Sequence, residues 1–434
     1  MSNALLDEWL SRLEQRAPET RIDLGLERVS VVADRLFVGD DWENVSVITI
    51  GGTNGKGSTV AFCESIALEA GLTTVAYTSP HLLVFNERLR INGKMAEATT
   101  WLDALERVDV ARADEALTWF EHVTLAALWI AKEHRPDLLL LEVGLGGRLD
   151  AVNVMEPDVA VITSIGLDHT DWLGPTRAHI GREKLGIARP GKPLIIGEPD
   201  WPEAAEEALV ASGAEVSRLD QDFWVEPVIA ASEGCWQLTL KEQSPITLPP
   251  LALMGRYQWT NAACAVLAIR ATQVWDAKLG WAVSPGLSRA RIEGRFERVQ
   301  ERPVVLLDVA HNPSGASALA GVLADETASR SHTGRTLAVF SALVDKDIRG
   351  IGEVMAPSID HWIVGNLEGS RGQTAGSVAQ QLRDCGVTVP IDTVESIPDA
   401  LDRALALSTP TDRVVVFGSF HVLTAVRSRW TRQE

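Results

Sequence analysis

The stretch from Val45 to Thr59, Val-Ser-Val-Ile-Thr-Ile-Gly-Gly-Thr-Asn-Gly-Lys-Gly-Ser-Thr, decides the fold. Its apolar, β-branched first part predicts a strand over Val45–Ile50, and the run from Ser58 to Ala70 is typical of a helix that ends at Gly71. A strand, a Gly-rich turn and a helix in this order form a phosphate-binding loop, because loop N–H groups and the helix N-terminus supply positive potential. The sequence therefore predicts a nucleotide site.

The loop supplies the first candidate contacts to ATP, which are Thr53, Asn54, Gly55, Lys56, Gly57 and Ser58. Lys56 is placed to reach the β- and γ-phosphates, and Ser58 or Thr59 to assist a magnesium ion. The strict Walker pattern is not met, because Ile50 occupies the first glycine position and Gly57 follows the lysine. A flexible turn with an exposed lysine is the alternative, but the strand before the loop and the helix after it favour nucleotide binding.

Strands and helices alternate along the rest of the chain, which indicates an α/β protein with parallel sheets. We expect a P-loop-type parallel-sheet ATPase domain over residues 1–293 and a smaller Rossmann-like α/β domain over residues 294–434. Pro285, Gly286 and Gly294 loosen the pattern near the join, and residues 198–251 read as an irregular end of the first domain. Further strands are expected at Thr74–Thr78, Asp137–Val143, Asp158–Ser164, Val304–Asp308, Thr336–Phe340, His361–Val364 and Arg413–Phe417.

Composition narrows the class of protein. The chain has 434 residues, with 40 Lys and Arg against 59 Asp and Glu, a net charge of −19 that argues against non-specific nucleic-acid binding. We expect no membrane association, since no apolar run is long enough to span a bilayer and the N-terminus lacks a signal-peptide core. The four cysteines are widely spaced, which is typical of reduced thiols in a cytoplasmic protein.

Polar groups follow successive predicted strands. Glu142 ends a very apolar strand, at the edge where open α/β sheets bind their ligands, and could hold Mg²⁺ or form an ion pair there. His169, after the next strand, could ligate a metal or cap a turn, and the repeated placement favours chemistry at this edge. By composition alone, Lys184 reads as a solvated surface lysine.

Taken together, these residues resemble the dihydrofolate synthase/folylpolyglutamate synthase family of the Mur ligase superfamily. The resemblance extends over nearly the whole chain, in the family's order. It rests on Ile22–Val29, Gly52–Ser58, Ser79–Leu82, Leu141–Asp150, Leu167–Gly174, Gly181–Ile187, Asp308–Pro313 and Gly418–His421.

This resemblance implies roles for individual residues. It implies that Ser79, Glu142 and His169 hold Mg²⁺, two ions in all, and that Lys184 is carboxylated by CO₂ to a metal-ligating carbamate, which reverses its reading as a surface lysine. Lys56, Lys184 and His169 are thus the candidate catalytic residues. It further implies a second set of ATP contacts, namely Asn261, Arg295, Asp308 and His311, and a pterin pocket of Asp23, Leu24, Gly25, Phe120 and Asp150.

Two departures from the family pattern occur. Val152 stands where the family often has Thr, which could alter a polar contact near the pterin. Glu293 stands where Pro often precedes the Gly-Arg pair, so the hinge between domains could be less rigid. The segment Gly418–His421 is open to two interpretations, a glutamate-binding element or a structural turn.

The function implied is ATP-dependent formation of an amide between a pterin or folate carboxylate and L-glutamate through an acyl phosphate, in folate biosynthesis. The partners are then small molecules, and the family implies a monomer. The alternatives are a folylpolyglutamate synthase without activity on dihydropteroate, a cell-wall Mur ligase, and an inactive nucleotide-binding regulatory protein. Too little chain precedes Val45 for the extra N-terminal domain of a cell-wall enzyme.

Overall fold

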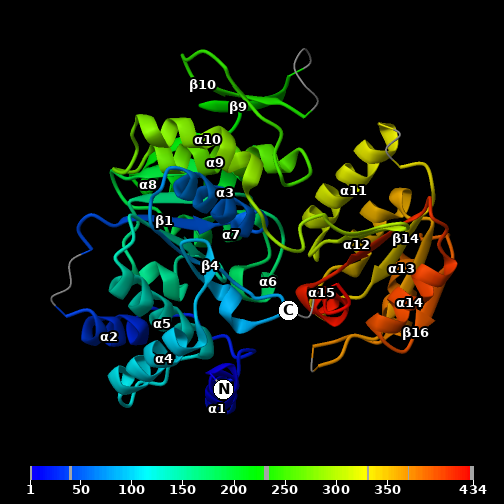
Figure 1. The fold of residues 1–434 in the computed structure, drawn as a ribbon, viewed down its shortest axis with the longest axis horizontal. Coiled ribbons are helices and arrows are strands. Elements are labelled where there is room, and N and C mark those ends of the chain that lie inside the picture. The colour runs from blue at the N-terminus through cyan, green and yellow to red at the C-terminus, as the bar shows by residue number, and fades with distance from the viewer. Residues whose placement is uncertain (1, 39–41, 229–233, 330–331, 370, 431–434) are drawn as a thin grey trace. The chain divides into compact units, whose positions relative to one another are not determined.

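The computed structural model describes residues 2–38, 42–228, 234–329, 332–369 and 371–430 (Figure 1). The chain forms two compact units. The first contains residues Met1–Gly166, Thr170–Ala252 and Trp259–Arg291, and the second contains Ile292–Glu434 with the short segments Leu167–His169 and Leu253–Gln258. A division at one point of the sequence would miss these two segments.

The first unit is built around a large sheet. Its strands are β1 (Ser46–Gly51), β2 (Thr74–Tyr77), β3 (Leu89–Ile91), β4 (Lys94–Met95), β5 (Leu138–Glu142), β6 (Val159–Ile162), β7 (Pro193–Ile196) and β8 (Glu215–Arg218). They lie in the order β4-β3-β2-β5-β1-β6-β7-β8, and all neighbours from β2 to β8 are parallel. β3 and β4 add an antiparallel edge. The central strand β1 is buried along its whole length.

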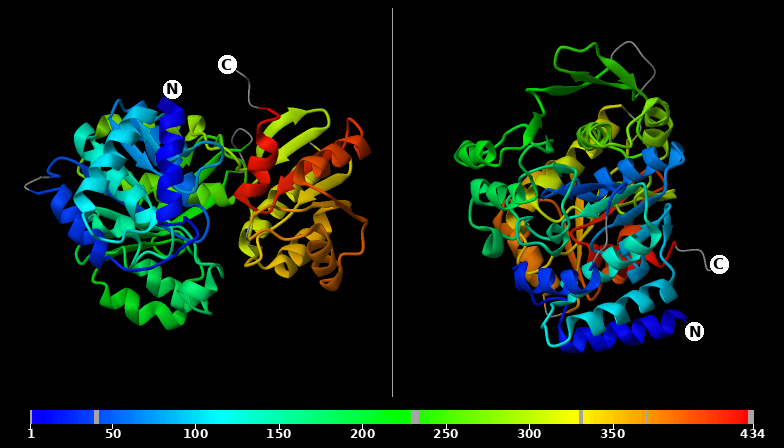
Figure 2. Two further views of the ribbon diagram at one scale, coloured as in Figure 1. Left: turned by 90° about the horizontal axis from the view of Figure 1, so that it is seen from below. Right: turned by 90° about the vertical axis from the view of Figure 1, so that its left-hand side faces the viewer.

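Helices cover both faces of this sheet. The α-helices are α1 (Ser2–Arg16), α2 (Glu27–Leu36), α3 (Lys56–Glu69), α4 (Ala98–Arg112), α5 (Trp119–His134), α6 (Thr170–Leu173), α7 (Arg177–Leu185), α8 (Glu206–Ala211), α9 (Tyr257–Arg270) and α10 (Ala277–Arg289). Short 3₁₀ turns are η1 (Phe85–Arg88), η2 (Ala151–Val154) and η3 (Glu203–Ala205). α3 packs on the sheet beneath α10, whereas α5 and α4 lie on the opposite face with α1 alongside α4 (Figures 1 and 2).

The second unit has a sheet of its own. Its strands are β12 (Glu297–Glu301), β13 (Val304–Leu307), β14 (Thr336–Phe340), β15 (His361–Gly365), β16 (Ile391–Val394) and β17 (Arg413–Phe417). Their order is β12-β13-β17-β14-β15-β16, parallel except for the antiparallel edge strand β12. The helices are α11 (Pro313–Ala328), α12 (Ile348–Met355), α13 (Ala375–Asp384), α14 (Ile397–Leu407) and α15 (Phe420–Arg427), with the 3₁₀ turn η4 (Ala356–Ser358).

The core of the second unit lies between its sheet and helices α11, α12 and α13. Phe340, Trp362 and Phe417 come from three neighbouring strands, are buried, and form mutual ring contacts with centroids 4.9 to 6.0 Å apart. Helices α14 and α15 pack together separately from this cluster. Three large rings at one point of a sheet give this unit its own hydrophobic core.

The predicted fold class is confirmed, and each expected strand is present within one or two residues. The interpretation of residues 198–251 as irregular is wrong: they contain β8 and a separate antiparallel sheet of β9 (Phe223–Pro227), β10 (Trp236–Leu240) and β11 (Ile246–Leu248). Pro285 and Gly286 do not loosen the chain either, because they lie within α10. Gly286 lets α10 approach the backbone of α3, since a β-carbon there would lie 2.6 Å from Cα of Ile66.

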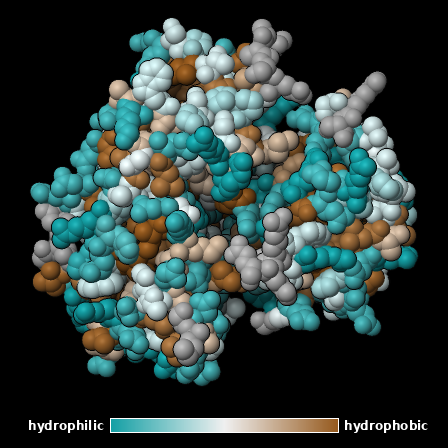
Figure 3. Space-filling model, in the orientation of Figure 1, coloured by the Kyte–Doolittle hydropathy of each residue, from teal (hydrophilic) through white to brown (hydrophobic). Residues whose placement is uncertain are grey.

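The face drawn in Figure 3 is mostly hydrophilic, with hydrophobic residues in small groups, as the strongly acidic composition predicts. Across the described ranges, no helix combines the length and the apolarity needed to cross a bilayer.

Candidate active site

The Gly-rich loop between β1 and α3 is fastened to the loop that follows β6. The N–H groups of Thr53 and Asn54 donate to the carbonyl and the hydroxyl of Ser164, each at 2.9 Å. The Thr53 hydroxyl donates to the Gly166 carbonyl at 3.2 Å and accepts from its N–H at 2.9 Å. Because β1 and β6 are parallel neighbours, their two following loops meet at the same edge and hold each other.

Two glycines of this loop have no room for a side chain. Gly52 and Gly55 have φ values of +147° and +89°, where residues with a β-carbon are strained. A β-carbon on Gly52 would also clash with the Thr163 hydroxyl, and one on Gly55 with the side-chain oxygen of Asn261 from α9. Asn261, a predicted ATP contact, is thus packed directly against the phosphate loop.

Lys56 begins α3 and folds back over the loop. Its Nζ donates to the carbonyls of Gly52 at 3.1 Å and Thr53 at 3.4 Å. Of the two candidate hydroxyls, that of Thr59 is buried and donates to the Gly55 carbonyl at 3.0 Å, so it serves the helix. Gly57 and Ser58 lie in the first turn of α3. The backbone N–H groups of this turn give the helix N-terminus a positive potential, which favours binding of an anion.

Glu142 and Ser79 meet at the carboxyl edge of the same sheet. Glu142 is the last residue of β5 and Ser79 follows its neighbour β2, and the Ser79 N–H donates to Glu142 Oε2 at 3.2 Å. Glu142 is only 5% exposed, although it is acidic. A hydroxyl and a carboxylate are hard oxygen donors of the kind that Mg²⁺ and Mn²⁺ bind.

Lys184 is not the solvated lysine that composition suggested, since the residue is 3% exposed within α7. α7 packs on the loop that follows β5: Arg148 N–H donates to the Glu183 carbonyl at 2.8 Å, and a β-carbon on Gly147 would lie 3.1 Å from Cα of Lys184. Lys184, which is distant from Glu142 in the sequence, therefore lies against the loop that begins after Glu142.

The predicted pterin residues of the N-terminal segment are tied to α5 by Arg28. The Arg28 guanidinium contacts the Asp23 carboxylate at 3.2 Å and donates from Nε to Glu121 at 2.8 Å. Glu121 follows Phe120 in the first turn of α5, where it forms a capping box with Thr118. The segment Asp23–Gly25, Leu24 included, is thereby fixed to the helix that carries Phe120.

Phe120 itself packs over the loop that follows β5. A β-carbon on Gly144 would lie 2.6 Å from its ring, so Gly144 is needed for this approach. The ring also lies 6.3 Å from that of Tyr77 on β2, measured between centroids. An aromatic face at this edge suits a flat heterocycle.

Asp150 holds its loop in shape. Its two oxygens accept from the N–H groups of Leu145 at 2.7 Å and Val152 at 3.0 Å, and it caps η2. Burial raises the pKa of Asp150 to about 6, against the opposing effect of these N–H groups and of Lys56. Both oxygens are engaged by backbone, so Asp150 shapes the loop. Val152, one of the two departures from the family pattern, is buried.

The second unit carries the remaining predicted ATP contacts. The Arg295 guanidinium lies 5.5 Å from the centre of the Phe420 ring. Asp308 is buried, with its carboxylate accepting the N–H groups of Phe296 and Ala310, each at 2.8 Å. Burial raises the pKa of Asp308, and the nearby Arg295 charge opposes the rise. His311 bonds from Nδ1 to the Val309 carbonyl at 2.8 Å.

The segment Leu167–His169 belongs to this second unit, with Asp168 inserted among its residues. The Asp168 carboxylate contacts His311, Asn312 and Lys346. His169 follows with a φ of +51°, in the left-handed region. Across the described residues no three His, Cys, Asp or Glu side chains converge as a metal site, and the predicted ligands include only two such residues, Glu142 and His169.

Two further sequence expectations concern loops of the second unit. Ser419 caps α15 by accepting a hydrogen bond from the Val422 N–H at 3.2 Å, so the segment Gly418–His421 contains the start of a helix.

Glu293, the second departure from the family pattern, is paired with Arg427 of α15 at 3.2 Å. Arg427 also pairs with Glu297 at 2.9 Å.

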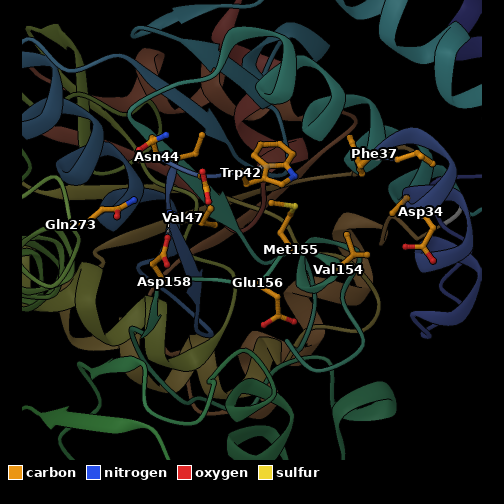
Figure 4. Close-up of a pocket in the computed structure, with 14 residues that line it drawn as sticks. Asp34, Phe37, Trp42, Asn44, Val47, Val154, Met155, Glu156, Asp158 and Gln273 are labelled. Atoms are coloured by element: carbon orange, nitrogen blue, oxygen red, sulfur yellow. Dashed lines mark hydrogen bonds between the residues drawn. The ribbon is translucent and has the colours of Figure 1, made fainter. Parts of the chain in front are cut away.

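A cavity of about 750 Å³ lies elsewhere in the first unit (Figure 4). Trp42 lies beside Met155 in it, with the carboxylates of Glu156 and Asp158 on its rim, and it opens near the start of β1 and β6. The phosphate loop follows the opposite end of β1. This cavity is therefore not part of the candidate site.

Comparison with known proteins agrees with this geometry. Residues 50–269 match the Mur ligase middle domain, and residues 294–420 match the Mur ligase, glutamate ligase domain. The dihydrofolate synthase/folylpolyglutamate synthase of Escherichia coli (strain K12) is 40% identical over 425 residues, covering 97% of this chain and 94% of that protein. The chain belongs to the dihydrofolate synthase/folylpolyglutamate synthase family of Mur ligases.

Solved structures of this family share the fold. E. coli FolC in complex with DHPP and ADP superposes with a TM-score of 0.88 at 39% identity, covering 98% of this chain and 97% of that one. The Mycobacterium tuberculosis folylpolyglutamate synthase complexed with ADP gives 0.87 at 31% identity, with both chains fully covered. A bifunctional family member with Mn, AMPPNP and L-glutamate bound gives 0.84 at 37%, covering 98% of this chain and 97% of that one.

Three residues of the group of contacts around the Asp168 carboxylate were not predicted from the sequence. Asp168, Asn312 and Lys346 were not among the predicted site residues, although Asp168 and Asn312 directly neighbour two that were. Adjacency to His169 and His311 was the available signal. Nothing in the sequence pairs Lys346 with Asp168, 178 positions away.

Gly55→Ala tests the packing of the phosphate loop. The new β-carbon would strain a positive-φ position and displace Asn261, so we expect nucleotide affinity to fall on the order of tenfold or more. Titration with a fluorescent ATP analogue measures it. Gly191→Ala is the matched control, because Gly191 has a φ of +68° but no described neighbour within 4 Å of the added carbon. Equal losses in both variants would contradict the packing argument.

Asp150 predicts a specific pH dependence of stability. Its pKa is raised in the folded protein from 3.8 to about 6, so the folded state holds this proton more tightly than the unfolded chain. The resulting stabilisation is fully present below about pH 4 and is lost as the pH rises to about 6. The free energy of unfolding of the wild type minus that of Asp150→Asn should fall on the order of 2–3 kcal/mol over this range. Urea unfolding at several pH values measures it, and a constant difference would refute the prediction.

Proposed function

We propose that this protein is an ATP-dependent ligase that joins L-glutamate to the carboxylate of a pterin acid, dihydropteroate, and of reduced folate glutamates. The observation that carries this proposal is the phosphate loop with Lys56, set at the same sheet edge as the Glu142–Ser79 pair. The family relatives support it, since they include enzymes named for both activities. Solved relatives were captured with ADP, DHPP, AMPPNP, Mn and L-glutamate.

The chemistry follows from the weakness of a carboxylate as an electrophile. A carboxylate oxygen attacks the γ-phosphorus of ATP, the bond to the β-phosphate oxygen breaks, and an acyl phosphate and ADP result. The amine of glutamate then attacks the carbonyl carbon, a proton leaves the nitrogen, and the tetrahedral intermediate expels phosphate. Lys56 and the N–H groups of the loop stabilise the charge on the transferring phosphoryl group. Lys56 exchanges its two loop carbonyls for phosphate oxygens.

We assign the cation ligands to Ser79, Glu142, His169 and Lys184. Mg²⁺ at these residues would neutralise phosphate charge during transfer. The donor set fits a hard cation through the oxygens of Glu142 and Ser79. Lys184 fits once its amine has added CO₂, because a buried ammonium is costly whereas a carbamate offers anionic oxygens.

The remaining assignments are Asn261, Arg295, Asp308 and His311 to ATP, and Asp23, Leu24, Gly25 and Phe120 to the pterin, with Asp150 shaping that pocket. The packing of Asn261 on Gly55 and of Phe120 on Gly144 supports these roles. We further propose a monomer that works in the cytoplasm, where the free thiols of all four cysteines are stable.

Phosphate release by the purified protein tests the function. We expect release from ATP with Mg²⁺ only when both a pterin acid and L-glutamate are present, since glutamate is needed to resolve the acyl phosphate. Release with reduced folates but not with dihydropteroate would favour the folylpolyglutamate synthase alone. Nucleotide binding without any release would favour an inactive regulatory protein.

Lys184→Ala tests the carbamate. We expect ligation to fall by about 10²-fold or more, because one cation ligand is lost, while ATP binding stays largely intact. Acetate or formate added at high concentration should restore part of the activity by supplying the missing carboxylate. Lys192→Ala, which removes a half-exposed lysine paired with Asp158, is the control and should leave activity unchanged. Near-normal activity of Lys184→Ala would remove this residue from the mechanism.

A further inference from the structure

Asp168 is the centre of a buried polar cluster in the second unit. Its Oδ2 lies 3.2 Å from His311 Nε2 and accepts from Asn312 Nδ2 at 3.0 Å, and its Oδ1 accepts from Lys346 Nζ at 2.6 Å. The side chains of Asp168 and Lys346 are 9% and 5% exposed. A buried carboxylate with three cationic or polar partners is strongly held.

The charges in this cluster are matched. Although burial opposes it, the hydrogen bond from His311 and the Lys346 charge hold the pKa of Asp168 well below its usual range. His311 contacts two oxygens, the Val309 carbonyl from Nδ1 and the Asp168 carboxylate from Nε2. Lys346 also lies 3.7 Å from Asp345, which is paired with Arg371 at 2.6 Å.

The same carboxylate fixes the backbone of the next residue. The His169 N–H donates to Asp168 Oδ1 at 2.9 Å, and the His169 ring Nε2 lies 3.9 Å from that oxygen. His169 has a φ of +51°, a conformation that costs a non-glycine residue free energy unless its surroundings enforce it. The partners of Asp168 supply that enforcement.

We propose that Asp168 is a positioning residue of the ligase, which orients His169 as a cation ligand by anchoring it to His311, Asn312 and Lys346. The proposal rests on the proposed function, because His169 is a cation ligand only there. Groups that orient a metal-binding histidine contribute to metal affinity although they do not touch the metal. Cation affinity should therefore depend on Lys346, which is not itself a proposed ligand.

The test measures Mn²⁺ binding by electron paramagnetic resonance of free Mn²⁺, at saturating AMPPNP, in the full-length protein. His169→Ala should weaken Mn²⁺ binding by about tenfold or more, and Asp168→Asn by about 10- to 100-fold. In either orientation of the new amide, its NH₂ group faces hydrogen-bond donors from which the carboxylate oxygen accepted, so those hydrogen bonds are lost. Affinity for AMPPNP without metal and circular dichroism are recorded for each variant.

Two further variants make the result decisive. Lys346→Met removes the closest partner of Asp168 and leaves the carboxylate in place, so it should also weaken Mn²⁺ binding, and it decides the case if Asp168→Asn fails to fold. Asp171→Asn removes an exposed carboxylate from α6, three residues after Asp168, and should change Mn²⁺ affinity by less than about twofold.

The outcomes separate the two proposals. Loss of affinity in His169→Ala with normal affinity in Asp168→Asn and Lys346→Met would overturn the positioning role and leave the proposed function intact. Normal affinity in His169→Ala would overturn both the cation assignment of His169 and the role of Asp168. Equal loss in Asp171→Asn would show a non-specific charge effect and also overturn it.

Discussion

The lack of space for a β-carbon at Gly52 and Gly55 is the constraint on which the first unit depends. Both residues turn the chain from β1 into α3 at positive φ, with Thr163 and Asn261 packed against them. This packing brings β6 and α9 to the loop and leaves its N–H groups in one fixed arrangement. A phosphate site made of backbone dipoles needs such rigidity, because dipoles that must reorganise stabilise charge poorly.

The proposed site residues of the first unit lie with this loop along one edge of a parallel sheet. Strands β2, β5, β1 and β6 are neighbours and run in the same direction, so the residues that follow them converge. Ser79 and Glu142 meet for that reason, and α7 adds Lys184 against the loop after β5. The sheet explains why residues more than 100 positions apart in the sequence lie at one edge. The cavity beside Trp42 lies at the other end of β1 and is not part of this edge.

The sequence was enough to predict the strands and the Gly-rich loop between a strand and a helix, because periodicity and glycine placement are local properties. It could not predict partners that only the tertiary structure brings together. Lys184 looks solvated by composition but is buried, and the resemblance alone gave it a role. Pro285 and Gly286 suggested a loose join, whereas the missing side chain of Gly286 serves close helix packing. Asp23 and Phe120 are linked only through Arg28 and Glu121, a pair 93 positions apart.

Two buried aspartates show why residue type alone does not give a role. Asp150 and Asp168 both lie in loops that follow strands of the same sheet. The partners of Asp150 are mainly backbone N–H dipoles, which offset only part of the cost of burying charge, so its pKa rises and the carboxyl holds a loop in shape. Asp168 faces an ammonium and an imidazole, so its charge persists and can anchor cationic partners. The difference lies in the partners of each carboxyl, which are backbone N–H groups for Asp150 and side chains for Asp168. The side chains that contact Asp168, those of His311 and Lys346 among them, belong to residues more than 140 positions further along the chain.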